Sequence, residues 1–250
     1  MASITGTGIG SQVDLYSSST TPLGAYQVGE FIFGANGKGF RHVLAGGSAL
    51  VVGNLLQESA QDTQFENMAV TATSINTNGI QTLNITNGTT TVTDNAFRGG
   101  SISVYTAGGE AIGYEYTILG VTGTLTSGGA MVVAVDHPIG TAWTTSLKVN
   151  MKRSPWSGVI QFPATTQTGI PVGVAIYPIA AGEYGWVQTK GVCGVLSDGS
   201  TFAVGSDLGT PSGTAGAVTV FAAGTTHARV GVSRQAAAAA HAISALLQID

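Results

Sequence analysis

The fold of this 250-residue chain is decided by Gly182-Glu-Tyr-Gly-Trp-Val-Gln-Thr-Lys-Gly-Val-Cys-Gly-Val-Leu196. The stretch predicts an aromatic-rich strand, a glycine turn and a second apolar strand, because aromatic and β-branched residues favour strands and glycine favours turns. A shorter echo lies near the N-terminus, where Phe40–Val43 runs through Ala45-Gly-Gly-Ser48 into Ala49–Gly53. Neither stretch carries a group suited to catalysis, so both indicate structural hairpins.

Runs of the same kind recur along the whole chain, and Gly, Asn, Ser or Pro residues bound them. The predicted strands are Glu30–Phe33, Phe40–Leu44, Ala49–Val52, Gln81–Ile85, Thr90–Thr93, Ser101–Tyr105, Tyr114–Leu119, Ala130–Val135, Lys148–Met151, Val159–Phe162, Val172–Ile176, Gly185–Thr189 and Val192–Leu196. The long amphipathic helices that parallel βαβ units need are missing. We therefore expect an all-β fold of short antiparallel strands in sandwich or barrel modules, jelly-roll-like ones included.

Two segments leave the choice between helix and strand open. Ala49–Gln64 contains good helix formers, but Gly53 weakens a helix there. Gln235–Leu247 is rich in alanine and prone to form a helix. Its last apolar residues nevertheless alternate with the period of a strand; they are Ile243, Ala245, Leu247 and Ile249. We favour a terminal strand.

By composition the chain divides into three parts. Residues 1–75 hold an N-terminal arm and a first strand cluster, residues 76–165 a central β block rich in Thr, Asn and Gly, and residues 166–250 a C-terminal β-hairpin region. The similar hairpin patterns near the two ends have three explanations: an internal repeat, coincidence, or one barrel shared by 1–75 and 166–250 around an inserted central block.

The sequence contains few charged residues, so the surface of the folded chain carries little charge. Only 9% of the residues are charged, against about 25% in an ordinary soluble domain, while 43% are hydrophobic and the mean hydropathy is +0.29. A lone monomer with so few charges is poorly protected against association. The composition therefore favours a subunit that lives in contact with other subunits over a solitary β protein with a Ser/Thr/Asn surface.

Charge and hydropathy also argue against nucleic-acid and membrane partners. The formal net charge is −4, and the densest cationic group, Lys148, Lys152 and Arg153 beside Trp156, is too small to neutralise many phosphates. Such a spot fits an acidic protein surface better. No apolar run reaches the roughly 18 residues that a membrane span needs, and the N-terminus lacks the pattern of a signal peptide.

Catalytic, cofactor and metal sites are not expected from the residue pattern. The single cysteine, Cys193, lies in a predicted strand and reads as a small core hydrophobe. The histidines do not stand at metal-ligand spacing. The one close acid–histidine pair, in Asp136-His137-Pro138, is better explained as a turn with a satisfied histidine. Gly34–Gly39 has the wrong spacing for a phosphate-binding loop, and no two carboxylates single themselves out as a glycosidase pair.

A family resemblance lies in an ordered set of short motifs. They are Phe97–Gly100, Gly113–Ile118, Asp136–Ile139, Pro155–Val159, Gly173–Ala175, Tyr184–Gly191 and Gly213–Val218, preceded by Pro22–Gly24 and Phe40–Val43. Each motif is mostly glycine and aromatic residues, so their order and combination carry the comparison. In this order the motifs, which span nearly the whole chain, resemble the capsid cement, or head decoration, proteins of tailed double-stranded DNA bacteriophages.

The resemblance implies a non-enzymatic protein, made in the host cytoplasm, that sits on the outer surface of the virion head. There it would bind the major capsid protein, as a homotrimer, without cofactor, nucleic acid or membrane. Trp186 and Tyr184, as bulky strand residues, join Lys148, Lys152 and Arg153 as candidate interface residues. For Trp186 the sequence does not decide between an interface and a core position. Two other classes stay open: another virion β protein, such as a head fibre, tail or receptor-binding subunit, and a secreted carbohydrate-active enzyme.

Overall fold

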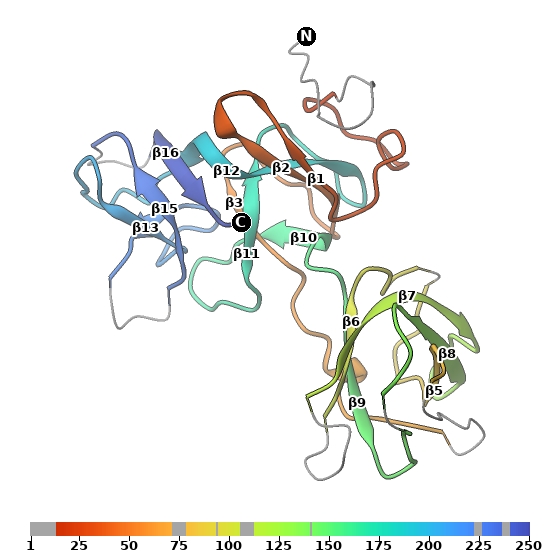
Figure 1. The fold of residues 1–250 in the computed structure, drawn as a ribbon. Coiled ribbons are helices and arrows are strands. Elements are labelled where there is room, and N and C mark those ends of the chain that lie inside the picture. The colour runs from red at the N-terminus through yellow and green to blue at the C-terminus, as the bar shows by residue number, and fades with distance from the viewer. Residues whose placement is uncertain are drawn as a thin grey trace. The chain divides into compact units, whose positions relative to one another are not determined.

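The computed structural model describes residues 14–71, 79–93, 95–105, 113–140, 142–222, 227–236 and 241–250. The predicted all-β class is confirmed, since the regular elements of these residues are strands β1 to β16 and two short 3₁₀ turns. They form two compact units, residues 1–60 with 155–250 (unit 1) and residues 61–154 (unit 2) (Figure 1). Within the described residues, no helix is both long and apolar enough to cross a membrane.

Unit 1 contains a ten-stranded sheet that closes partly on itself. Its strands are β1 (Phe31–Phe33), β2 (Gly39–Ala45), β3 (Leu55–Gln57), β10 (Ser157–Gln161), β11 (Pro171–Ala175), β12 (Tyr184–Leu196), β13 (Asp207–Gly209), β14 (Thr219–Val220), β15 (Arg229–Ser233) and β16 (Ala242–Gln248). Pairing of β2 with both β10 and β12 closes the strands β2, β10, β3, β11 and β12 into a barrel. The β2–β10 ladder is parallel, an exception to the expected antiparallel pairing.

The stretch that was expected to form a hairpin is one continuous strand. β12 pairs with β2 and β11 through its first half and with β16 from Lys190 to Leu196. Gly191 has a φ of +85°, and a Cβ atom there would lie 2.9 Å from the carbonyl oxygen of Gly37. Glycine therefore lets β12 run closely past the turn before β2 instead of reversing the chain.

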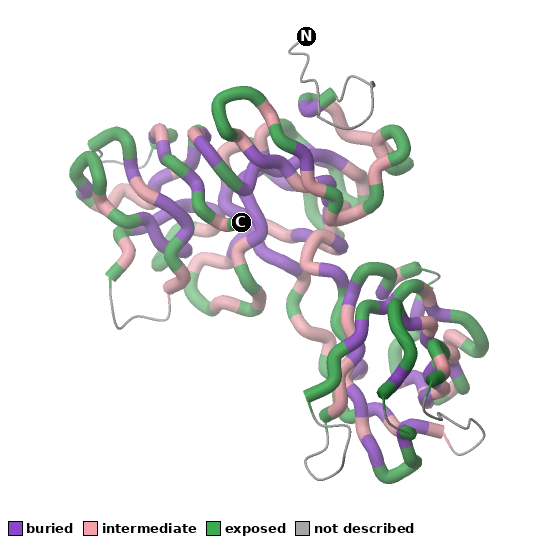
Figure 2. Tube along the Cα trace, in the orientation of Figure 1, coloured by how far each residue is buried: buried purple, intermediate pink, exposed green. Residues whose placement is uncertain are grey.

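Unit 2 is a six-stranded antiparallel sheet whose two edges meet. Its order is β4 (Met68–Ala69), β9 (Lys148–Lys152), β6 (Ser101–Val104), β7 (Glu115–Gly123), β8 (Ala130–Val135) and β5 (Thr82–Thr86). An isolated bridge from Val70 to Ile85 joins the β4 edge to the β5 edge. Alternating residues of these strands, such as Ile102, Tyr116 and Met131, are buried in the core. Figure 2 marks the buried and exposed stretches along the backbone trace of each unit.

The terminal strand predicted near the C-terminus is confirmed. In β16 the side chains of Ile243, Ala245 and Leu247 are buried beneath the sheet, while their neighbours face solvent. The alternation of apolar residues therefore outweighed the helix propensity of the preceding alanines. The middle of that alanine run, residues 237–240, lies outside the described residues.

Two local expectations are wrong, and one choice that was left open is decided. Ala49–Gln64, where helix and strand were both possible, carries the short strand β3 and the beginning of a 3₁₀ turn, Thr63–Phe65. Ala49–Val52 and Thr90–Thr93 are not strands; within the first, Leu50 alone makes a bridge, to Ile179. The half-exposed Val51 and Val52 lie in or beside a turn. In both segments β propensity was present but did not suffice to make a strand, because β propensity depends on tertiary context.

The division into units differs from the expected three parts. The boundaries lie at residues 60/61 and 154/155, ahead of the expected 75/76 and 165/166. Residues from both ends of the chain meet in unit 1, where β2 pairs with β12 from Leu44 opposite Tyr184 to Gly39 opposite Lys190. The central segment therefore forms a unit of its own between two halves of another.

Candidate functional site

Trp186 lies in the core of unit 1. Its side chain is 0% exposed and packs with those of Leu15, Ile32 and Phe40. The segment that precedes β1 closes over it, with the Tyr26 ring edge-on at 5.1 Å between ring centroids. A side chain covered by its own chain cannot anchor a partner, so the expected interface role of Trp186 is corrected to a core role.

Tyr184 belongs to the same aromatic cluster but remains half-buried. Its ring stacks on that of His42, with 5.7 Å between ring centroids. His42 is fully buried and bridges the cluster to the preceding segment: its Nε2 accepts the Leu23 N–H at 3.4 Å, and its Nδ1 lies 3.3 Å from the Gln27 carbonyl oxygen. These partners fit a neutral imidazole with its hydrogen on Nδ1. Burial lowers the pKa of His42, which agrees with that assignment.

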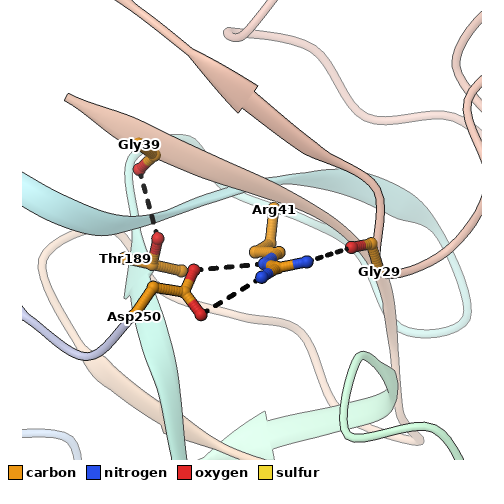
Figure 3. A network of polar contacts seen from close by, with 5 residues as sticks. All are labelled: Gly29, Gly39, Arg41, Thr189 and Asp250. Atoms are coloured by element: carbon orange, nitrogen blue, oxygen red, sulfur yellow. Dashed lines mark hydrogen bonds and ion pairs between the residues drawn. The ribbon is translucent and has the colours of Figure 1, made fainter. Parts of the chain in front are cut away.

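A polar network that the sequence did not predict centres on Arg41 (Figure 3). Arg41 of β2 donates to the carboxylate of Asp250 and, at 2.7 Å, to the Gly29 carbonyl oxygen. Its guanidinium also lies 4.9 Å from the ring centroids of Phe31 and of Trp156. Arg41 and Asp250 are 209 residues apart, so no local sequence signal could have joined them.

The three expected cationic residues do not form one patch. Lys148 and Lys152 lie on the same, outward face of β9, because the buried residues of that strand are Val149 and Met151. On this face Lys152 lies opposite Ser101 of β6, and Lys148 lies opposite Ala69 of β4. Arg153, the next residue along the chain, is exposed but leans over the Phe97 ring, with its guanidinium 5.6 Å from the ring centroid. The structure therefore groups the two lysines and separates the arginine.

Both units expose large apolar side chains. The set is spread over turns, edges and outward strand positions; it comprises Tyr16, Phe33, Val51, Val52, Ile170, Tyr177, Val204, Val220 and Leu246 in unit 1 and Tyr105, Tyr114 and Leu119 in unit 2. Phe33 at 58% and Val204 at 68% are the most exposed of those in unit 1. Because single exposed apolar residues are common, the significant feature is their occurrence on two separate units of a chain with few charges.

Cys193 and the pair Asp136 and His137, the other candidate reactive residues, have structural partners. Cys193 is buried in the core, and burial raises the pKa of its thiol to about 11, which confirms the expected core hydrophobe. His137 and Asp136 lie in a bend, where His137 Nδ1 is 2.8 Å from Asp136 Oδ1 and the His137 ring packs on Tyr116. The described part of the chain contains no group of three or more His, Cys, Asp or Glu residues able to hold a metal ion.

Comparison with protein-family models, with curated proteins and with solved structures gives no match for this chain.

Proposed function

We propose that this chain is a phage capsid cement protein that binds the outer surface of an icosahedral head and bridges major-capsid subunits. The observation that supports this most is the two-unit architecture. Each unit has its own core and its own exposed apolar side chains, and under this proposal each unit contacts a different capsid subunit. When two surfaces are joined in one molecule, the second contact forms at a high effective concentration, and the combined binding is much stronger than either contact.

The low charge supports the same proposal. Only 9% of the residues are charged, so few ionised side chains have to lose their water when this surface contacts a protein shell. The desolvation cost of binding is therefore small. A homotrimer would multiply the contacts again, and we propose that state for the protein on the shell. Sedimentation velocity of the purified chain tests it: a stable monomer at micromolar concentration that also stays monomeric on the shell contradicts the trimer.

Reconstitution on heads that lack the chain is the direct test. Heads of the encoding phage should form without it but release DNA at a lower temperature, and addition of the purified chain should restore their heat resistance. Co-sedimentation with intact heads should give a fixed copy ratio to the major capsid protein. If bare heads resist heat as well as complete ones do, cementing is wrong, and a head-fibre, tail or receptor-binding role becomes the better account.

A further inference from the structure

Unit 1 contains a loop, residues 20–28, that is fastened to the sheet at both ends and forms a strap between them. At its start, the Ser19 N–H donates to the Tyr184 carbonyl oxygen of β12 at 3.1 Å, and the Tyr184 N–H donates back to Ser19 at 2.7 Å. At its end, the Gly29 N–H donates to the His42 carbonyl oxygen of β2 at 2.8 Å. The middle of the strap can therefore lift from the sheet while both of these anchors stay in place.

The strap itself is held by few contacts. None of its residues is buried, and its Leu23 and Tyr26 side chains pack against the core cluster that contains Trp186. Among the hydrogen bonds between described residues, those that connect the strap to the sheet strands end on the side chain of His42. The Leu23 N–H donates to Nε2 at 3.4 Å, and Nδ1 lies 3.3 Å from the Gln27 carbonyl oxygen. One imidazole therefore fastens the middle of the strap.

We infer that His42 is a pH-sensitive switch: the neutral imidazole holds the strap against the core, and protonation of the imidazole releases it. With its hydrogen on Nδ1, the ring donates to Gln27 and accepts from Leu23. A second proton places an N–H on Nε2, so that two donors, the ring and the Leu23 amide, face each other. The new charge is also buried, since His42 is 0% exposed, and a buried charge without water is costly.

Three aromatic rings pack around the imidazole. They belong to Tyr26 of the strap and to Tyr184 and Trp186 of β12, and their centroids lie 6.4, 5.7 and 5.0 Å from that of the His42 ring. Phenol and indole rings carry no charge in mild acid. They replace water around the imidazole, so they disfavour its protonated form.

One carboxylate opposes the effect of burial. Glu30, whose side chain accepts the Gln27 N–H at 2.9 Å, raises the pKa of His42 by its negative charge. Arg41 precedes His42 on β2, and its side chain therefore points to the opposite face of the strand. Burial is the largest influence and holds the pKa of His42 below its ordinary value of 6.5. The closed strap is therefore fully favoured above pH 6.5, and opening becomes easier as the pH falls from there to the lowered pKa.

Release of the strap uncovers apolar surface. The Tyr26 ring lies edge-on to Trp186, with 5.1 Å between ring centroids, and Leu23 packs on the same cluster. Both side chains move away with the strap, whereas Trp186, Ile32 and Phe40 stay on their strands. Unit 1 thus presents in mild acid an apolar surface that it covers at neutral pH.

Amide hydrogen exchange followed by NMR tests the switch on the whole chain, with each rate expressed relative to that of an unfolded chain at the same pH. Protection of the Leu23 amide should be constant above pH 6.5. Below that pH it should fall about tenfold per pH unit, because opening takes up one proton, and it should level off where the His42 ring itself titrates. At every pH it should be lower than the protection of amides in the β2–β12 ladder. Dilute urea should lower the protection of the ladder amides alone, because local opening exposes little surface.

Three variants assign the proton. In His42→Gln the side chain at this position does not titrate, so the protection of Leu23 should no longer depend on pH. Glu30→Gln removes the negative charge but keeps an oxygen for the Gln27 N–H. It should lower the pKa of His42, so the fall in Leu23 protection should continue to lower pH before it levels off. His137→Gln, in unit 2, should behave as the parent does.

The parent protein alone can overturn the proposal, even where His42→Gln does not fold. Leu23 protection that does not respond to the titration of His42 contradicts the switch. Leu23 protection equal to that of the β2–β12 ladder contradicts it too, because the strap would then open only when unit 1 unfolds. A pH dependence that persists in folded His42→Gln would assign the proton to another group and refute the role of the imidazole.

Discussion

Arg41 and Asp250 form a two-pronged ion pair that ties β2 to the residues after β16. Arg41 Nε lies 3.1 Å from Asp250 Oδ2, and Nη2 lies 3.3 Å from Oδ1. The two side chains are 28% and 22% exposed, so solvent screens the pair only in part. Since the same guanidinium also bonds to Gly29 and stacks near Phe31, it joins three segments of unit 1.

Arg41→Ala should lower the free energy of unfolding of unit 1 by about 1–2 kcal/mol, because a charge-assisted fork and ring contacts are lost together. Arg41→Lys should recover only a small part of the lost free energy of unfolding, since an ammonium cannot make the two parallel hydrogen bonds to the Asp250 carboxylate. Urea unfolding measures both. Arg229→Ala is the matched control: its pair with Asp207 is about half exposed on both sides, and its loss should cost less than about 1 kcal/mol. Equal losses for Arg41 and Arg229 would contradict the importance of the network.

Gly191→Ala should destabilise the chain by about 1–3 kcal/mol, because it combines a positive φ with a Cβ atom 2.9 Å from the Gly37 oxygen. Gly194→Ala in the same strand is the control. No atom lies within 4 Å of a Cβ there, so its effect should stay within about 0.5 kcal/mol. Thermal unfolding of the two variants makes the comparison. If both behave alike, the close approach of β12 to Gly37 does not depend on glycine at position 191.

The contrast between these two glycines also shows where sequence reasoning stopped. A Gly between two apolar runs predicts a turn when read locally, and Gly191 has the positive φ of a turn residue. Its actual role is set by Gly37 and Lys38, which come from a distant part of the chain. Local propensity therefore placed strands on both sides correctly, but only tertiary packing could show that they are one strand.

Burial could be predicted where it depends on residues nearby in the chain. The sequence predicted the buried side chains of β16 from their alternation and the buried Cys193 from its apolar neighbours. The sequence could not predict the burial of Trp186, since a bulky side chain with high strand propensity suits a core and an interface equally.

Trp186→Ala should cost about 3–5 kcal/mol of stability, since it empties a fully buried site. Trp186→Phe should cost much less, because the ring is partly replaced and the indole N–H has no hydrogen-bond partner among the described residues. Urea titrations followed by circular dichroism compare the two. Tyr105→Ala, at a 56% exposed position, is expected to change stability little. A Trp186→Ala protein as stable as the parent would exclude a core role.

The stability of unit 1 should fall in mild acid because of His42. Burial lowers its pKa below the ordinary value of 6.5, so the unfolded chain takes up the proton first. The stabilising contribution is therefore complete above pH 6.5 and is lost as the pH falls from there to the lowered pKa. The hydrogen bond with the Gln27 backbone and the negative charge of Glu30 both raise the pKa of His42, so they narrow this pH window. His42→Gln should flatten the pH profile of unfolding, whereas His137→Gln, at a 54% exposed side chain, should preserve it. A parent profile that is flat below pH 6.5 would refute the assignment.

Charge reversal on the outward face of β9 tests how the proposed shell contact is made. If acidic capsid surface meets Lys148 and Lys152, the double variant Lys148→Glu, Lys152→Glu should bind heads more weakly than the parent. The loss should be larger at low salt, where screening is weaker. Arg153→Glu is the control from the residue directly after β9, because this side chain leans over Phe97 instead of sharing the face of the lysines. Co-sedimentation with heads at two salt concentrations measures each variant, and unfolding temperatures verify their folds. Equal binding by all variants at both salts would show that this face points away from the shell, and would leave the exposed apolar side chains as the contact.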